Sequence, residues 1–307
     1  MSFFNVYTSI LSILNKKVNM GHDHSHQHKK VNNILLAFSL NASFAVIEFF
    51  GGIFTNSVAI MSDALHDFGD SLALLFSYFA DKLSRREANQ KYTFGYKRFS
   101  LVSALLNGTI LLVGSVFVIK EAIERLDSPE VVKPEGMLYL AILGIAVNSF
   151  AAYRLSKDEG LNVKMLMYHL LEDLLGWAAV LVVSVILLFK PWYVLDSVLS
   201  ILISLIILRG VLKNLLKVGK IFVQHFPEEI QREQLLKQIK SCDGVKDVHY
   251  LQGWSLDEST FNVTLHVVVD GSMRMIDADK LRKNVEGFLK EAKISMWTIQ
   301  LESEGHE

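Results

Sequence analysis

The chain has 307 residues, of which 51% are hydrophobic and 21% are charged, so it is too apolar for an ordinary soluble domain. Its formal net charge of −1 gives no indication of a nucleic-acid partner. The single cysteine, Cys242, excludes an intrachain disulfide and fits a reducing compartment.

Residues 1–31 form a polar leader. An apolar patch, Ile10–Leu14, follows no basic residue, so the pattern does not predict a signal peptide. The leader contains the sequence HDHSHQH, which has two interpretations: a metal-capturing segment or a solvated tail that binds metal without consequence. The histidines concerned are His22, His24, His26 and His28.

Residues 32–217 are predicted to form a transmembrane domain. A membrane-spanning helix needs about 20 mostly apolar residues. Six segments of the sequence meet this requirement, which predicts an all-α bundle of six transmembrane helices. They are residues 33–54, 57–80, 100–122, 136–155, 165–189 and 194–212.

The basic residues of the loops predict the orientation of this bundle. The stretch Asp81–Phe99 holds six lysines and arginines, and the leader and the loop after the fourth segment are also basic. The loops on the opposite side hold few basic residues, so both termini are expected in the cytoplasm. The compact loops favour a plasma membrane, and a bacterial inner membrane in particular.

Two of the predicted membrane-spanning segments contain ionisable residues. A carboxylate at the centre of a membrane helix costs roughly 2.5–3.5 kcal/mol on insertion scales, so a function or a strong partner is expected to maintain it. For Asp63 and Asp67 the alternative is a place at a helix end, near the lipid headgroups. The ionisable residues are Asp63, His66, Asp67 and Asp70 in the second segment, and His169, Glu172 and Asp173 in the fifth.

The spacing of these residues indicates a metal site. His66 and Asp70 are four residues apart, as are His169 and Asp173. Positions i and i+4 share one face of a helix, so each pair can offer an imidazole and a carboxylate to one ion. Both aspartates lie about 12–15 Å from the cytoplasmic ends of their segments, at about 1.5 Å per residue, and can meet near the midplane.

The donor types favour particular metals. Four ligands suit tetrahedral zinc, and two imidazoles with two carboxylates favour zinc, cobalt or cadmium over manganese or magnesium. The metal is expected to be the transported substrate, and no cofactor is expected. Two alternatives remain open: an intramembrane metalloenzyme, which needs an open coordination position and a general base, and a proton-coupled transporter of an organic solute.

Residues 218–307 have the composition of a soluble domain. Apolar spacing predicts a helix over Pro227–Ser241, and alternation predicts a strand over Phe261–Val269. The predicted order of helices and strands is αββαβ, a small α+β fold. The other predicted elements are strands over Val245–Leu256 and Ser295–Glu302 and a helix over Ala278–Lys293.

Several motifs resemble those of the cation diffusion facilitator family of zinc exporters, and the match runs from about Asn32 to Glu302. They include SVAIMSDALHDFGDSLAL from Ser57, TFGYKRFSLVSALLN from Thr93, HLLEDLLGW from His169 and SVLSILISLIILRGVL from Ser197. The chain looks most like the bacterial cobalt-zinc-cadmium efflux proteins.

The resemblance implies that His66, Asp70, His169 and Asp173 form the transport site. It also implies metal–proton antiport by alternating access, and a homodimer joined through metallochaperone-like cytoplasmic domains. Relatives of the manganese and iron type have Asp in place of the second-segment histidine. The family often has a histidine-rich loop after the fourth segment, but here Ser156–Lys164 contains no histidine, and the leader is a candidate for its role.

The resemblance also points to a second metal site in the soluble domain, formed by His249, His266 and Glu302. Gln252 and Gln300 stand where relatives have histidine. Fewer imidazoles predict weak metal binding. The alternative for His225, His249 and His266 is that they are ordinary polar surface residues.

Overall fold

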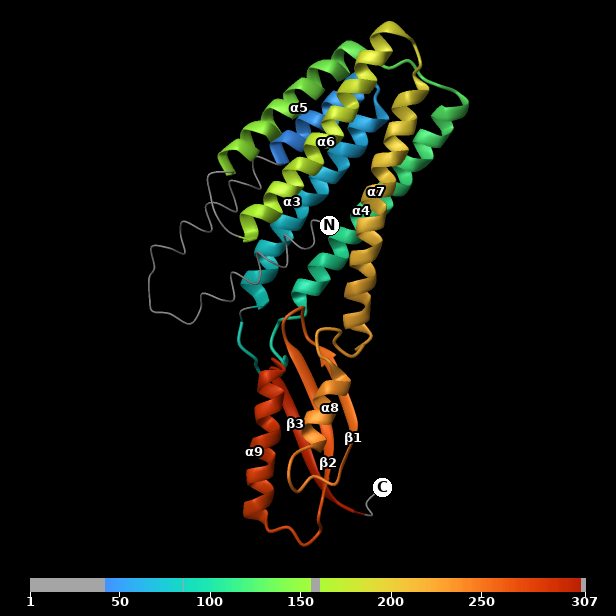
Figure 1. The fold of residues 1–307 in the computed structure, drawn as a ribbon. Coiled ribbons are helices and arrows are strands. Elements are labelled where there is room, and N and C mark those ends of the chain that lie inside the picture. Colours follow the sequence, from blue (N-terminus) through green and yellow to red (C-terminus); the bar gives the residue numbers. More distant parts are fainter. Residues whose placement is uncertain (1–41, 85, 156–160, 305–307) are drawn as a thin grey trace, which may run out of the picture. The chain divides into compact units, whose positions relative to one another are not determined.

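The computed structural model describes residues 42–84, 86–155 and 161–304 (Figure 1). The chain divides into two compact units between Leu216 and Lys217, and each is described by itself. Three segments fall outside the described residues: the leader with its four histidines, the start of the first predicted membrane segment, and residues 156–160.

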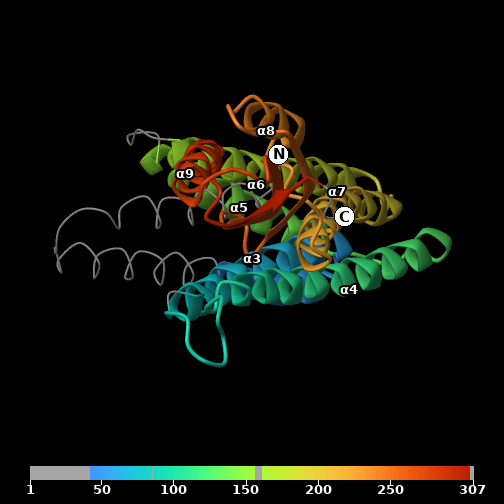
Figure 2. The ribbon, with the colours of Figure 1, turned by 90° about the horizontal axis from the view of Figure 1, so that it is seen from below.

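The first unit is built from long helices, which confirms the predicted helical bundle. The helix Ala42–Thr55 is followed by five helices that Figures 1 and 2 show running alongside one another. They are α3 (Val58–Ser84), α4 (Phe99–Asp127), α5 (Pro134–Leu155), α6 (Leu161–Phe189) and α7 (Val194–Phe222).

Four helices among the described residues are long and apolar enough to cross a membrane: α4, Pro134–Tyr153 of α5, Leu170–Phe189 of α6, and α7. Helix α3 has 27 residues, but its first half carries Asp63, Asp67 and Asp70. Large apolar side chains such as Phe117, Phe150 and Leu175 are exposed on the outside of the bundle. Long apolar helices with an apolar outer surface are typical of an integral membrane protein.

Helices α3 and α4 pack extensively against each other, and so do α5 and α6. Glycines permit this close packing, as is common between membrane helices. A Cβ atom on Gly114 of α4 would lie 2.4 Å from Leu65, and one on Gly144 of α5 would lie 2.3 Å from Trp177. Trp177 is fully buried and anchors the apolar core between α5 and α6.

The second unit is a small domain with a three-stranded sheet, as predicted. The strand order is β1-β2-β3, with β1 antiparallel and β3 parallel to the central strand β2. Two helices cover one face of the sheet, and their residues Leu235, Ile239, Val285 and Leu289 form the core with Leu265. The elements are α8 (Arg232–Lys240), β1 (Asp247–Ser255), β2 (Phe261–Val269), α9 (Met275–Glu291) and β3 (Met296–Ser303).

Some element ends differ from the predicted ones. Helix α8 begins at Arg232 rather than Pro227, because a turn precedes it in which Ile230 N donates to Pro227 O at 3.2 Å. Helix α7 continues to Phe222, beyond the predicted end at residue 212. Its last turns bury Val218 and Ile221, so packing within the second unit continues the helix where the apolar run stops.

Candidate metal sites

The first candidate site begins on α3. His66 and Asp70 lie one turn apart on this helix, with His66 Nε2 3.7 Å from Asp70 Oδ2. The side chain of Asp70 is 3% exposed and that of His66 is 22% exposed. Both side chains therefore face a common point, from which the imidazole remains partly accessible.

Helix α6 brings a further carboxylate to this point. Asp173 lies close enough to Asp63, Asp67 and Asp70 for their charges to interact. One turn further along α6, Gly176 leaves room for the Asp63 carboxylate. Position 169 lies in the helical part of α6, four residues before Asp173, but the side chain of His169 is outside the described part of the structure.

The structure adds a carboxylate that the sequence analysis missed. Glu48, in the helix Ala42–Thr55, is fully buried and interacts electrostatically with Asp67, Asp63 and Asp173. Asp63 and Asp67 are also buried, at 8% and 7% exposure. The signal was present in the sequence, because a lone glutamate inside an apolar membrane segment is costly and is usually functional.

A second candidate site lies on the sheet of the small domain. Glu302 joins two imidazoles: its Oε2 lies 3.0 Å from His249 Nε2, and its Oε1 lies 2.9 Å from His266 Nδ1. The potential ligand atoms of all three residues lie within 4.8 Å of one another. This is a geometry in which one ion can contact three protein ligands.

Strand register explains this second cluster. His249 pairs with His266 across β1 and β2, and His266 pairs with Gln300 across β2 and β3. Paired residues point to the same face of a sheet, so Glu302, two residues after Gln300, lies on that face as well. Gln300 donates a hydrogen bond from Nε2 to Glu302 Oε1 at 2.8 Å, and so supports the carboxylate.

A β-bulge in β1 follows His249. Two residues, Tyr250 and Leu251, stand opposite Leu265 alone, and Tyr250 adopts a positive φ of 50°. The extra residue keeps Gln252, which pairs with Thr264, on the same face as His249 and His266. Gln252 therefore belongs to the face that carries the cluster, although its side chain is a weaker metal ligand than imidazole.

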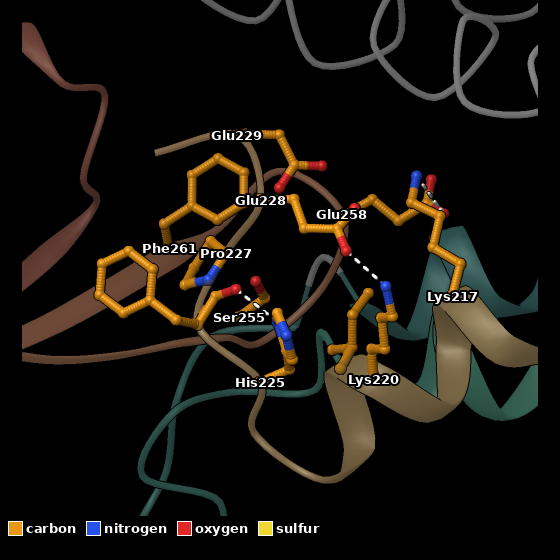
Figure 3. Close-up of a pocket in the computed structure, with 11 residues that line it drawn as sticks. Lys217, Lys220, His225, Pro227, Glu228, Glu229, Ser255, Glu258 and Phe261 are labelled. Atoms are coloured by element: carbon orange, nitrogen blue, oxygen red, sulfur yellow. Dashed lines mark hydrogen bonds and ion pairs between the residues drawn. The ribbon is translucent and has the colours of Figure 1, made fainter. Parts of the chain in front are cut away.

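A small pocket of about 40 Å³ in the second unit has different chemistry (Figure 3). Lysines and glutamates face one another across it, with Lys220 Nζ 2.5 Å from Glu228 Oε1 and Lys217 Nζ 3.6 Å from Glu258 Oε1. Burial raises the pKa of Glu258 to about 7. His225 lies at its rim and contacts Phe226 O through Nδ1 at 2.7 Å, so it is placed away from the His249 cluster.

Comparison with known proteins identifies the class of protein that this fold represents. Residues 34–223 match the cation efflux transmembrane domain, and residues 227–304 match the cation efflux protein cytoplasmic domain. The chain therefore belongs to the cation efflux family, whose known members are transporters, and the family resemblance seen in the sequence is confirmed.

Individual relatives cover nearly the whole chain. It is 32% identical over 292 residues to a "Cadmium, cobalt and zinc/H(+)-K(+) antiporter" of Bacillus subtilis, covering 94% of this chain and 93% of the relative. It is 31% identical to the "Zinc transporter ZitB" of Escherichia coli, covering 92% and 93%. It is 33% identical to the "Metal cation efflux system protein CzcD" of Cupriavidus metallidurans, covering 82% and 81%.

Proposed function

We propose that this protein exports a divalent metal ion, chiefly zinc and also cobalt or cadmium, out of the cytoplasm in exchange for protons. The observation that carries the proposal is the convergence of His66 and Asp70 of α3 with Asp173 of α6 inside the bundle. The names of the relatives support the choice of metals, since they include a cadmium, cobalt and zinc antiporter and a zinc transporter.

The metal is held by His66, Asp70, His169 and Asp173. An ion with two positive charges offsets the cost of burying the carboxylates in a region of low dielectric constant. Two imidazoles and two carboxylates give zinc the donor set and number that it prefers. These residues act as binding groups for a transported substrate, so we assign the protein no enzymatic activity and no cofactor.

Protons move in the opposite direction at the same site. An imidazole binds metal only in its neutral form, so metal binding releases protons from protonated ligands. After metal release, the empty site returns more easily with protons on its histidines or aspartates than with uncompensated charges. Exchange of cytoplasmic zinc for external protons by alternating access follows from this cycle.

In the membrane, the chain forms six spans, the first from residue 33 and the second along α3, with both termini in the cytoplasm. The protein resides in the plasma membrane and works as a homodimer joined through residues 218–307, a metallochaperone-like domain. The match to the family's cytoplasmic domain supports this arrangement. His22, His24, His26 and His28 of the leader deliver metal to the bundle.

The cluster of His249, His266 and Glu302 binds a regulatory metal ion weakly. Three ligand atoms within 4.8 Å of one another fit such an ion. The neighbouring positions 252 and 300 carry amide side chains, and Gln300 already bonds to Glu302. Each missing imidazole removes a favourable zinc bond, so the affinity is low.

Zinc flux into inside-out liposomes containing the purified protein tests the proposal. We expect Asp70→Ala and Asp173→Ala to abolish the flux, while Asp127→Ala, an exposed carboxylate at the end of α4, serves as the matched control. An imposed proton gradient should accelerate zinc flux, and zinc flux should acidify or alkalinise the lumen accordingly. Near wild-type flux in Asp70→Ala, or flux that ignores the proton gradient, would contradict the proposal. Flux of an organic solute without metal would point to the solute carrier instead.

A further inference from the structure

The N-terminus of α3 is capped by a residue from another helix. The carboxylate of Asp196, in the first turn of α7, accepts a hydrogen bond from Ser57 Oγ at 2.5 Å and from Val58 N at 2.8 Å. It also accepts one from the backbone of Ala59. Asp196 is only 1% exposed and Ser57 is fully buried.

This contact meets a requirement of α3. The first N–H groups of a helix have no partner within the helix, and inside a membrane bundle each one left unsatisfied is costly. Ser57 Oγ accepts from Ile60 N at 3.2 Å, and Asp196 takes the N–H groups of Val58 and Ala59. The negative charge of Asp196 also lies at the positive end of the helix dipole.

A second hydrogen bond extends the contact between the two helices. Ser62 Oγ of α3 lies 2.8 Å from Ser204 Oγ of α7, and both residues are buried. Positions 196, 200 and 204 are spaced by four residues and so share one face of α7. This face of α7 is therefore joined to α3 at two points, at its first turn and two turns later.

The turn before α3 is also fixed from α4. Arg125 donates from Nη1 to Asn56 O at 2.9 Å and from Nη2 to Asn56 Oδ1 at 3.1 Å. Asn56 adopts a positive φ of 57°, and these contacts hold that conformation. The start of α3 thus has a defined position with respect to both α7 and α4.

We propose that Asp196 is a positioning residue for metal transport, because its cap sets the depth and rotation of α3 and thereby the placement of His66 and Asp70. This inference rests on the proposed function of those two residues. They follow Val58 by about 12 and 18 Å along the helix, at about 1.5 Å per residue, with a continuous helix between. A displacement at the first turn therefore reaches both metal ligands.

The test measures the zinc concentration for half-maximal flux, and the ratio of zinc to cadmium flux, per protein inserted in liposomes. For Asp196→Ala we expect the half-maximal concentration to rise about tenfold, the factor that corresponds to losing an N-cap of roughly 1.4 kcal/mol. The zinc-to-cadmium ratio should also change, because the ligands are displaced. Asp196→Asn keeps an acceptor oxygen and should stay within about twofold of wild type.

A purely structural role would lower the amount of folded protein but leave both kinetic quantities unchanged, and that result would overturn the proposal. Failure of Asp196→Asn as severe as that of Asp196→Ala would also overturn it. If Asp196→Ala does not reach the membrane, Ser57→Ala decides the matter, since it loses only one of the two side-chain contacts. That variant should shift the half-maximal concentration in the same direction, and an unchanged value would refute the positioning role. Wild-type protein without zinc flux would instead refute the proposed function.

Discussion

Oδ1 of Asp63 in α3 lies 3.8 Å from the place where a Cβ atom on Gly176 of α6 would stand. A methyl group at that distance makes ordinary van der Waals contact, so we predict that Gly176→Ala keeps zinc transport. Gly176→Leu should lower it strongly, because overpacking costs about 1–3 kcal/mol and would push α6 away from the carboxylates of α3. Zinc flux per inserted protein measures the effect.

The control for this prediction is Gly219→Leu in α7, where no atom lies within 4 Å of the added Cβ position. Equal flux in Gly176→Leu and in the control would mean that α3 and α6 do not need this close approach during transport.

A second prediction concerns metal selectivity. His66→Asp replaces a nitrogen donor with oxygen next to Asp70, and oxygen-rich sites suit harder ions. We expect manganese flux to rise relative to zinc flux, by about tenfold if one donor changes the preference by roughly 1.4 kcal/mol. Parallel flux measurements with both metals check this, and His225→Asp in the second unit is the control. A ratio that does not move would place selectivity on other residues.

A third prediction concerns the pH dependence of the β1–β2 connection. Burial raises the pKa of Glu258 from 4.5 to about 7, so the folded connection holds a proton that the unfolded chain releases between these pH values. Stability from this group is therefore highest below pH 4.5, falls as the pH rises towards 7, and stays low above it. The total change is about 3 kcal/mol at 1.36 kcal/mol per pKa unit.

Hydrogen exchange of residues 255–261 in the full-length protein measures this change. We expect exchange corrected for its intrinsic pH dependence to accelerate from pH 5.5 to pH 8. Glu258→Gln should abolish the dependence, whereas Glu228→Gln, at an exposed carboxylate of the same pocket, should retain it. A Glu258→Gln profile that matches wild type would show that another group controls the opening.

A fourth prediction concerns metal binding by the small domain. Residues 226–307, produced alone, should fold and dimerise without metal, since their apolar core is formed within one chain. Zinc should raise the melting temperature only modestly, as mass action requires for a weak site, and His249→Ala should reduce the shift. Gln252→His should enlarge it, because the bulge keeps position 252 on the face of His249 and His266.

Analytical ultracentrifugation and thermal melts with and without zinc check the fourth prediction. A domain that dimerises only with zinc, or a melting temperature raised by tens of degrees, would contradict the weak site. Gln234→His on α8 is the control for an added imidazole away from the cluster.

Sequence reasoning predicted the parts of this structure that depend on composition and periodicity. Apolar runs located the helices of the bundle, and alternation located β2 at Phe261–Val269 without error. The i,i+4 spacing of His66 and Asp70 required only helical geometry, and the structure places them on one face. Helix ends were less accurate, because α7 continues to Phe222 through packing that hydropathy does not encode.

The remaining features depend on contacts between residues distant in sequence. Asp196 and Ser57 are 139 positions apart, so no local pattern reveals the cap between them. The bulge at Tyr250 places a large residue at positive φ, against its local preference, because the pairing of β1 with β2 determines the register. Glu48 was visible as a glutamate in an apolar segment, but its proximity to Asp63 and Asp67 required the folded bundle.

The hydrogen-bonded contact of Glu302 with two imidazoles has a consequence for what the small domain senses. A metal ion that enters this cluster must replace the protons that now join Glu302 to His249 and His266. Occupancy therefore follows the ratio of metal to proton activity rather than metal concentration alone. A cell that acidifies while zinc stays constant would empty the cluster, so the domain would read the two gradients of the antiport cycle together.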